Sequence, residues 1–370
     1  MDLVPVTEGG TEFLVPVQDP ARAFPPGSSP VFFNPRMALS RDATTLLLRG
    51  IPLESYLDAM GATGARGIRV AGECRIPVTI NDRDTLAVDV IQKNAAYAGV
   101  PAEITQCDVN LLLSSRRFDA VDLDPFGTPA PFVDAAARSA RKYLFVTATD
   151  TAPLCGAHGR AGARRYFAHP VNNEYHRETG LRTLLGFIVR EVVKYDRGLE
   201  PLLSFTREHA IRLHLKIHPG VRHADETLDR MGFILQCNRC FYRLEEPGLV
   251  PSGGQCTCGG KFIPIGPLYL GAINHPGVIS SMLDRLPSVP LAAGKELFRL
   301  LSLLQEELPT SSHYDYHRMA RSLHTSPPPI ETVLRRVEDS GYRVSRAHYS
   351  GTAIKTDAPV GVLERAINGE

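Results

Sequence analysis

Residues 120–129, AVDLDPFGTP, close an apolar run with two acidic residues and two prolines. The run FDAVDL, which leads into the DPFG sequence, has the composition of a buried strand. Asp122 and Asp124 therefore stand where such a strand should finish. The residues around them decide whether they end the strand in a turn or line the working edge of an enzyme.

The flanking sequence predicts a parallel sheet. Strand patterns beside this run cover residues 55–60, 77–82, 102–107 and 142–150. Amphipathic helical patterns lie between them, at residues 85–99 and 131–143. Strands that alternate with helices at this spacing predict βαβ units and a Rossmann-like α/β domain. In such sheets ligands bind outside the carboxyl ends of the strands.

The composition is that of a folded protein whose charge is balanced. The chain has 370 residues, 43% hydrophobic and 22% charged, so two domains are expected. Its 41 Lys and Arg face 40 Asp and Glu, so a nucleic-acid partner requires positive charge arranged locally. We expect no signal peptide and no membrane span. Seven cysteines, four of them clustered, favour a reducing cytoplasm and one metal site.

The composition and periodicity of the sequence change after the last of these strand patterns. Residues 155–180 are rich in Gly, Arg and His and show no clear period. Residues 206–217, TREHAIRLHLKI, alternate apolar and polar side chains like a half-exposed strand. We place a domain boundary just before this strand. The first domain is then 1–205, with an N-terminal extension over 1–50, and a smaller α+β domain covers 206–370.

A glycine turn follows the first strand pattern. Asp58 ends that strand, and Gly61, Gly64 and Gly67 follow in the sequence GATGARG. Glycines at this place allow a tight turn and the close approach of a cofactor to the backbone. Their spacing differs from the dinucleotide G-x-G-x-x-G, and an ordinary βα turn is the alternative.

Two more acidic residues occupy the same place on the next two strands. Asp82 lies where a carboxylate can bind ribose hydroxyls. Asp108 repeats the position one strand later, where a carboxylate can accept a hydrogen bond from an adenine amino group. The alternative for each is an N-cap of the helix that follows. The three strand-end acids together favour a nucleotide-like cofactor, either nicotinamide or S-adenosylmethionine.

The DPFG sequence separates these two cofactors. It resembles the (D/N)-P-P-(Y/F) motif of methyltransferases that act on exocyclic amines of bases, and it is unexpected in a dehydrogenase. The amine is a poor nucleophile because its lone pair is delocalised into the ring. Asp124, helped by the carbonyl of Pro125, can hydrogen-bond the N–H groups and receive a proton. Phe126 can stack on the base. A turn initiator is the alternative for Asp124 and Pro125.

With these motifs in place, the chain resembles the archaeal-type tRNA (guanine(26)-N(2))-dimethyltransferase family nearly end to end. The segments that carry the resemblance are FFNPRMALSRD, LDAMGATGARGIR, VDLDPFGTPAPFVDAA, IGPLYLGAI and SGTAIKTDAP. The resemblance implies a class I S-adenosylmethionine-dependent fold and one or two methyl transfers to N2 of guanine. It also implies that the cofactor contacts are Arg36, Arg66, Asp82, Asp108 and Val109, and that Asp124 is the acid–base residue. The role of Asp122 stays open.

Four cysteines predict a zinc ribbon around residues 236–260. Cys237 and Cys240 form a C-x-x-C pair, and Cys256 and Cys258 follow as C-x-C. Thiolates suit tetrahedral Zn²⁺, and a site with four protein ligands has a structural role. The second pair is one residue shorter than usual, and four free cysteines on two hairpins are the alternative.

Two groups of basic residues are candidates for contact with tRNA. The first group combines basic and aromatic side chains: His158, Arg160, Arg164, Arg165, Tyr166, Phe167 and His169. Such a mixture suits phosphate contact and base stacking, although a solvated loop is an equal alternative. The second group lies near the end of the 206–370 domain: Arg343, Arg346, His348 and Lys355.

The competing function for the whole chain is a zinc-ribbon RNA-binding protein whose Rossmann-like domain is not catalytic.

Overall fold

The structure of this chain is a computed structural model that describes residues 1–17 and 30–369. Its described residues form two compact units, each discontinuous in sequence. The first unit comprises residues 1–148, 214–217 and 276–301. The second unit comprises residues 149–213, 218–275 and 302–370.

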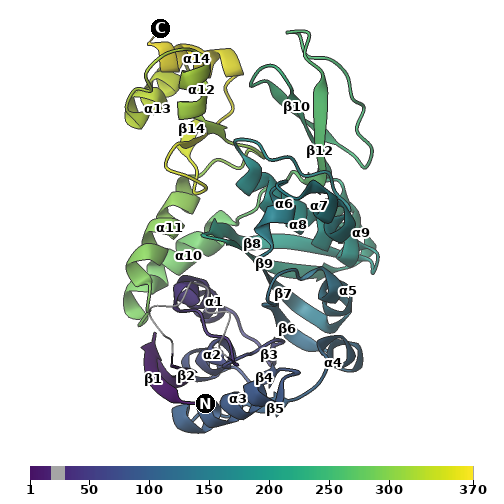
Figure 1. Ribbon diagram of the computed structural model, residues 1–370, viewed down its shortest axis with the longest axis vertical. Coiled ribbons are helices and arrows are strands. Elements are labelled where there is room, and N and C mark those ends of the chain that lie inside the picture. The colour runs from purple at the N-terminus through teal and green to yellow at the C-terminus, as the bar shows by residue number, and fades with distance from the viewer. Residues whose placement is uncertain (18–29, 370) are drawn as a thin grey trace. The chain divides into compact units, whose positions relative to one another are not determined.

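A parallel sheet forms the centre of the first unit, as the sequence predicts (Figure 1). Its strands are β3 (Tyr56–Asp58), β4 (Val78–Asn81), β5 (Glu103–Thr105), β6 (Phe118–Leu123) and β7 (Ala140–Ala148). They lie in the order β5-β4-β3-β6-β7. Leu57 of β3 pairs with Thr79 on one side and Val121 on the other. The five predicted strands are therefore confirmed, and their carboxyl ends share one edge.

Helices cover both faces of this sheet. In Figure 1, α1 (Ala38–Leu48), α2 (Ala65–Arg69) and α3 (Thr85–Ala98) lie on one side of the strands. The other side carries α4 (Val109–Ser115) and α5 (Ala130–Ser139). The predicted helix over 131–143 was too long, because β7 begins at Ala140 and takes its last residues. Gly99, with a φ of 64°, ends α3 in the left-handed conformation that favours glycine.

An N-terminal hairpin precedes these helices. It consists of β1 (Leu3–Glu8) and β2 (Thr11–Pro16), and the short helix η1 (Pro35–Met37) leads into α1. Phe13 and Val15 of the hairpin form an apolar cluster with Phe33 and Ala65. The π-helical turn η2 (Val70–Cys74) continues α2. The same unit contains α10 (Pro276–Arg285), η3 (Leu286–Ser288) and most of α11 (Gly294–Glu306).

The second unit begins with two short helices, the second of which lies in the stretch 155–180 where the sequence shows no clear period. Its elements are α6 (Thr151–Leu154), α7 (Gly159–Tyr166), α8 (His176–Val193), β8 (Arg197–Arg207), β9 (Ala210–Pro219) and α9 (Val221–Leu228). Gly159 and Gly162 obscured α7, because glycine is a poor helix former. Residues 214–217 of β9 belong to the first unit and continue its sheet beyond β7.

Two small antiparallel sheets complete the second unit. The first has the order β11-β10-β12, from β10 (Met231–Cys237), β11 (Arg243–Pro247) and β12 (Phe262–Tyr269). The second has the order β13-β15-β14, from β13 (Tyr314–Asp315), β14 (Val344–Arg346) and β15 (Ala353–Thr356). Apolar residues pack it against α12 (Tyr316–Ser322), α13 (Ile330–Asp339) and α14 (Val360–Asn368).

Among the described residues, no helix combines the length and the apolar character that crossing a membrane requires. The boundary expected between residues 205 and 206 falls inside β8. The division of labour that it implies, a catalytic part over 1–205 and a tRNA-binding part over 206–370, stays a prediction.

Candidate active site

Acidic side chains gather at the carboxyl edge of the parallel sheet. Asp58, the last residue of β3, pairs in register with Asp122 of β6. Asp124 follows β6 directly, and the guanidinium of Arg66 in α2 pairs with its carboxylate. Nε of Arg66 lies 3.7 Å from Oδ2 of Asp122, which accepts a hydrogen bond of 2.6 Å from the Tyr56 hydroxyl. The structure thus brings together two predicted site residues, Arg66 and Asp124, around a buried aspartate.

The electrostatics of this edge depend on one buried cation. Burial, and then the charge of Asp122, raise the pKa of Asp58 to about 7. Burial acts to lower the pKa of Arg66, but Asp122 and Asp124 outweigh it and raise that pKa. Nη1 of Arg66 also donates to the Thr44 hydroxyl at 3.0 Å. Asp122, on the buried side of Arg66, therefore orients and neutralises its guanidinium. This explains why a buried strand end carries an acid.

The glycine turn packs tightly against β4. A Cβ on Gly61 would lie 2.6 Å from Cγ2 of Ile80, and a Cβ on Gly67 would lie 2.6 Å from Cγ1 of the same residue. Gly64 has a φ of 75° and is the N-cap residue that precedes α2. These glycines let α2 approach the sheet, where the Gly67 amide donates to Oδ2 of Asp58 at 2.9 Å.

Asp82 holds this turn from the next strand. Its Oδ2 accepts a hydrogen bond of 2.9 Å from the amide of Ala62, which has a φ of 50°. The N-cap of α3 is Asp84, so the alternative reading of Asp82 as that cap is wrong. Asp82 is half-buried, and its carboxylate stands at the mouth of the glycine turn.

Asp108 and Val109 lie one strand farther along the same edge. Asp108 is exposed and caps α4, with Oδ1 accepting from the amides of Asn110 at 2.8 Å and Leu111 at 3.3 Å. Val109 is the first residue of α4, and its side chain is buried. The capping alternative for Asp108 is confirmed as a structural role, and it fixes the carboxylate beside the Val109 amide.

The segment that contains Arg36 is packed onto the same unit. Val31 clusters with Ala87 and Val90 of α3. The ring of Phe32 meets the ring of Phe126 edge to face, with 5.8 Å between centroids. The side chain of Phe126 is 81% exposed. The segment before α1 and the DPFG loop after β6 therefore place two aromatic rings together.

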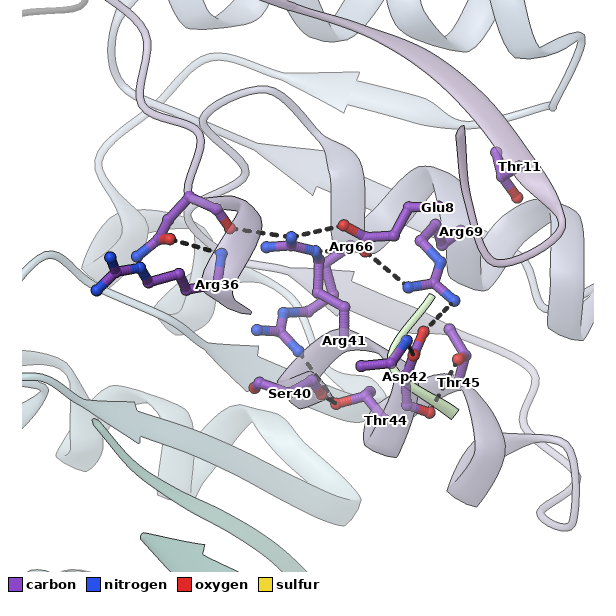
Figure 2. A network of polar contacts seen from close by, with 12 residues as sticks. Glu8, Thr11, Arg36, Ser40, Arg41, Asp42, Thr44, Thr45, Arg66 and Arg69 are labelled. Carbon is purple, nitrogen blue, oxygen red and sulfur yellow. Dashed lines mark hydrogen bonds and ion pairs between the residues drawn. The ribbon is translucent and has the colours of Figure 1, made fainter. Parts of the chain in front are cut away.

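A buried ionic network holds that segment in place (Figure 2). Arg41 of α1 makes two hydrogen bonds to the carboxylate of Glu8 in β1, of 2.6 and 2.7 Å. Nη2 of Arg41 also donates to the backbone carbonyl of Asn34 at 3.0 Å. The Asn34 side chain accepts from the amide of Arg36 at 2.9 Å. Figure 2 shows the exposed side chain of Arg36 directed away from the Glu8 and Arg69 cluster.

Arg69 lies at the centre of the network. Its fully buried guanidinium pairs with Glu8 at 2.7 Å, Asp42 at 2.8 Å and Glu73 at 2.7 Å. Burial acts to raise the pKa of Glu8, but its contacts with Arg41 and Arg69 lower it overall. One cation therefore connects β1, α1 and η2.

The four predicted cysteines come together in the second unit. Their sulfur atoms all lie within 4.8 Å of one another. Sγ of Cys237 is 3.4 Å from Sγ of Cys258, and Sγ of Cys240 is 3.8 Å from Sγ of Cys256. A Cβ on Gly260 would lie 2.5 Å from the Cys237 sulfur. The C-x-C spacing thus brings its sulfurs to the C-x-x-C pair.

The two predicted basic groups differ in the structure. Lys355 and His348 of the second group are buried and pair with Glu307 at 3.0 and 2.7 Å. Lys355 also pairs with Glu178 at 2.8 Å. These two residues, and the buried Tyr166 of the first group, were wrongly taken as surface contacts for RNA. Lys355 instead neutralises buried carboxylates, and Nδ1 of His348 lies within hydrogen-bond distance of one of them.

Sequence reasoning missed several residues that shape the site. Thr44 bonds to Arg66 and Tyr56 bonds to Asp122, while Glu8 bonds to Arg41, which reaches the backbone of Asn34. His214, from β9, lies 3.0 Å from the Thr44 hydroxyl.

This chain matches the family model described as N2,N2-dimethylguanosine tRNA methyltransferase over residues 14–368. The chain belongs to this family. A curated relative from Methanosphaerula palustris, named tRNA (guanine(26)-N(2))-dimethyltransferase, is 57% identical over all of both chains. A relative of the same name from Methanoculleus marisnigri is 58% identical, again over all of both chains.

A solved structure shows the same fold. The complex of Trm1 from Pyrococcus horikoshii with S-adenosyl-L-methionine is similar with a TM-score of 0.90 and 35% identity. The match covers 99% of this chain and 100% of that one. The family and the Rossmann-like methyltransferase fold expected from the sequence are therefore confirmed.

We predict that Asp58→Asn makes the protein more stable at high pH. Because the pKa of Asp58 is raised to about 7, its stabilising contribution is complete below pH 4 and is lost as the pH rises through 7. The variant avoids the free-energy cost of ionising this buried carboxyl, which is on the order of 4 kcal/mol above pH 7. Thermal unfolding between pH 5 and 8.5 measures this. The gain in Tm of Asp58→Asn over wild type should grow as the pH rises. The control Asp134→Asn, at an exposed acid, should show no such gain. Parallel pH profiles of Tm for wild type and Asp58→Asn would contradict the prediction.

Proposed function

We propose that this protein transfers one or two methyl groups from S-adenosylmethionine to the exocyclic N2 of guanine 26 in tRNA. The observation that carries the proposal is Asp124 at the carboxyl edge of the sheet, paired with buried Arg66, in a chain of the dimethylguanosine methyltransferase family. The function and enzyme class expected from the sequence agree with the family and with the names of its relatives.

The residues at the carboxyl edge fit the methyl donor. Asp82 offers a carboxylate to ribose hydroxyls, and Asp108 with the Val109 amide offers an acceptor and a donor to an adenine ring. Arg36, exposed on the segment held by Arg41, provides a cation for the methionine carboxylate. Arg66, the fifth predicted contact, borders this site while paired with Asp124. When bound, S-adenosylmethionine supplies an electrophilic methyl group.

Asp124 activates the guanine amine. Its half-buried carboxylate accepts hydrogen bonds from N–H groups of the base and receives the proton that the amine loses. Arg66 fixes the orientation of this carboxylate, and the backbone carbonyl of Pro125 is a second acceptor beside it. A guanine that has received one methyl still carries one N–H, so the same groups serve a second transfer.

Phe126 and Phe32 hold the base. The exposed ring of Phe126 offers a stacking surface to a guanine turned out of the tRNA. Phe32 supports that ring edge to face and belongs to the segment that carries Arg36. The same segment therefore contributes to the proposed positions of both the donor and the base, which keeps the reacting atoms together.

The four cysteines bind a structural zinc ion. In a tetrahedral site with Zn–S bonds of about 2.3 Å, sulfurs are separated by about 3.8 Å. The sulfur distances of 3.4 and 3.8 Å fit this geometry. The protein supplies all four ligands, so the ion stabilises the β10–β12 sheet and takes no part in methyl transfer.

The second domain, 206–370, contributes to tRNA binding, and the enzyme works in the cytoplasm.

Incubation of unmodified tRNA transcript with the protein and S-adenosylmethionine tests the proposal. We expect N2-methylguanosine and N2,N2-dimethylguanosine at position 26 by nucleoside mass spectrometry of the isolated fragment. A transcript with adenine at position 26 is the control and should yield neither. If the guanine transcript also stays unmodified, the alternative of a non-catalytic RNA-binding protein replaces the proposal.

Replacement of Asp124 tests the catalytic assignment. We predict that Asp124→Asn and Asp124→Ala lower kcat by about 10²–10⁴-fold, because the proton acceptor is lost. Binding of S-adenosylmethionine, measured by calorimetry, should stay within a few-fold of wild type because the predicted donor contacts remain. Asp134→Ala, an exposed acid on α5, is the matched control and should keep full activity. Full activity in Asp124→Asn would remove Asp124 from this role.

Metal analysis tests the zinc site. We predict about one zinc per chain in the purified protein and a near-complete loss in Cys256→Ser, because three thiolates hold zinc less tightly than four. The loss should also lower Tm. Cys74→Ser, at a half-buried cysteine outside the cluster, should retain the metal. Equal zinc content in wild type and Cys256→Ser would refute the assignment.

A further inference from the structure

A surface of α7 combines two exposed arginines with an exposed aromatic ring. Arg160 and Arg164 are exposed one turn apart, and Phe167 follows three residues later. Positions four residues apart lie on one face of a helix, and Phe167 is the C-cap residue that ends α7. The side chain of Phe167 is 69% exposed. We call Arg160, Arg164 and Phe167 the α7 surface.

Phe167 occupies a backbone conformation that a bulky residue rarely adopts. Its φ is 48°, in the left-handed region where the end of a helix usually places glycine. A phenylalanine there has a conformational cost, and an exposed ring gains little packing in return. Strain of this kind persists where the surrounding structure enforces it and is characteristic of binding sites.

Hydrogen bonds from two directions enforce this conformation. Arg190 of α8 donates to the carbonyl of Phe167 at 3.1 Å and to the carbonyl of Tyr166 at 2.5 Å. On the other side, the backbone of His169 exchanges hydrogen bonds of 2.7 and 3.3 Å with Gly266 of β12. The ring of Phe167 is therefore presented from a fixed backbone and not from a loose loop.

The body of α7 is anchored just as firmly. A Cβ on Gly162 would lie 2.6 Å from the carbonyl oxygen of Pro153 and 2.6 Å from Cγ of Pro170. The buried Tyr166 donates to Asp150 at 2.7 Å and packs edge to face on Phe187. The opposite face, with Arg160 and Arg164, is thereby turned outward in a fixed orientation.

The charge of the α7 surface selects an anionic partner. Residues 151–170 contain three arginines and two histidines and no acidic residue. Arg165 pairs with Asp150, which leaves Arg160 and Arg164 as a like-charged pair one turn apart. Such a pair destabilises a helix slightly unless an anion lies between the two charges, which favours a role in binding anions. Arginines beside an exposed aromatic ring match the phosphates and unstacked bases of RNA.

We propose that the α7 surface binds the tRNA substrate, with Phe167 stacked on an unpaired base and Arg160 and Arg164 on neighbouring phosphates. This inference rests on the proposed tRNA methyltransferase function and adds a second aromatic contact, separate from the DPFG loop. Because the backbone that carries the ring is fixed before binding, stacking requires little further ordering of the chain. The contact tolerates any base, since every base has a π face.

Phe167→Gly separates this role from a structural one. Glycine suits a φ of 48°, so the Tm of the variant should equal or exceed that of wild type. Its Kd for unmodified tRNA transcript should nevertheless rise by about 5- to 100-fold. The slope of log Kd against log salt should stay unchanged in Phe167→Gly and fall by about one unit in Arg164→Gln. Phe298→Ala, at another exposed phenylalanine, should bind tRNA like wild type.

Fluorescence reports the stacking directly, because the chain contains no tryptophan. Phe167→Trp should bind tRNA within a few-fold of wild type, and the emission of its single indole should be quenched on addition of tRNA. Phe298→Trp should show no such quenching. Wild-type affinity in Phe167→Gly, or unquenched emission in Phe167→Trp at saturating tRNA, would overturn the inference. Methylation of guanine 26 by the wild-type protein would still support the proposed function in that case.

Discussion

The buried guanidinium of Arg69 is the interaction on which the first unit depends. It pairs with carboxylates of Glu8, Asp42 and Glu73, which belong to β1, α1 and η2. Removing one partner from such a cluster leaves an uncompensated buried charge, which is far more destabilising than the loss of a surface ion pair. The glycine turn, the N-terminal hairpin and the segment before α1 are therefore held in one arrangement. Arg41 extends that arrangement to Asn34 and so to Arg36.

Arg66 is a second buried cation paired with carboxylates, and it supports the candidate site. It is buried between Asp122 and Asp124, yet Asp124 itself is only half-buried. The buried aspartate offsets the desolvation of the cation, and the half-exposed one remains accessible to a substrate. Asp58 bears the consequence, because burial and the charge of Asp122 raise its pKa to about 7. The loss of stability therefore comes from Asp58, a residue that supports the site and is not itself a predicted contact. Such a cost is common where a site is preorganised.

Much of this architecture was predictable from local sequence. The five strands, the acids that end them and the four cysteines follow from hydrophobic periodicity and residue spacing, which depend on near neighbours. The ionic network was not predictable, because Glu8, Arg41 and Arg69 lie far apart in sequence and no spacing indicates which of them pair. The helix α7 was missed because its glycines weaken the helical pattern, although Gly162 is there for close packing against Pro153 and Pro170. The roles of Lys355 and His348 were wrong for a related reason, since sequence does not distinguish a buried basic side chain from an exposed one.

That last distinction explains how a chain of balanced charge can bind RNA. Net charge counts every ionised group, but the field at the surface comes mainly from those in contact with solvent. Lys355, Arg69 and Arg66 are neutralised by buried carboxylates within a few ångströms, so neither partner contributes much outside the protein. Arg160 and Arg164 stand on a stretch of twenty residues without an acid, and their charge is directed to solvent. A formal net charge of +1 is therefore compatible with a strongly basic local surface, and α7 is where the fold exposes one.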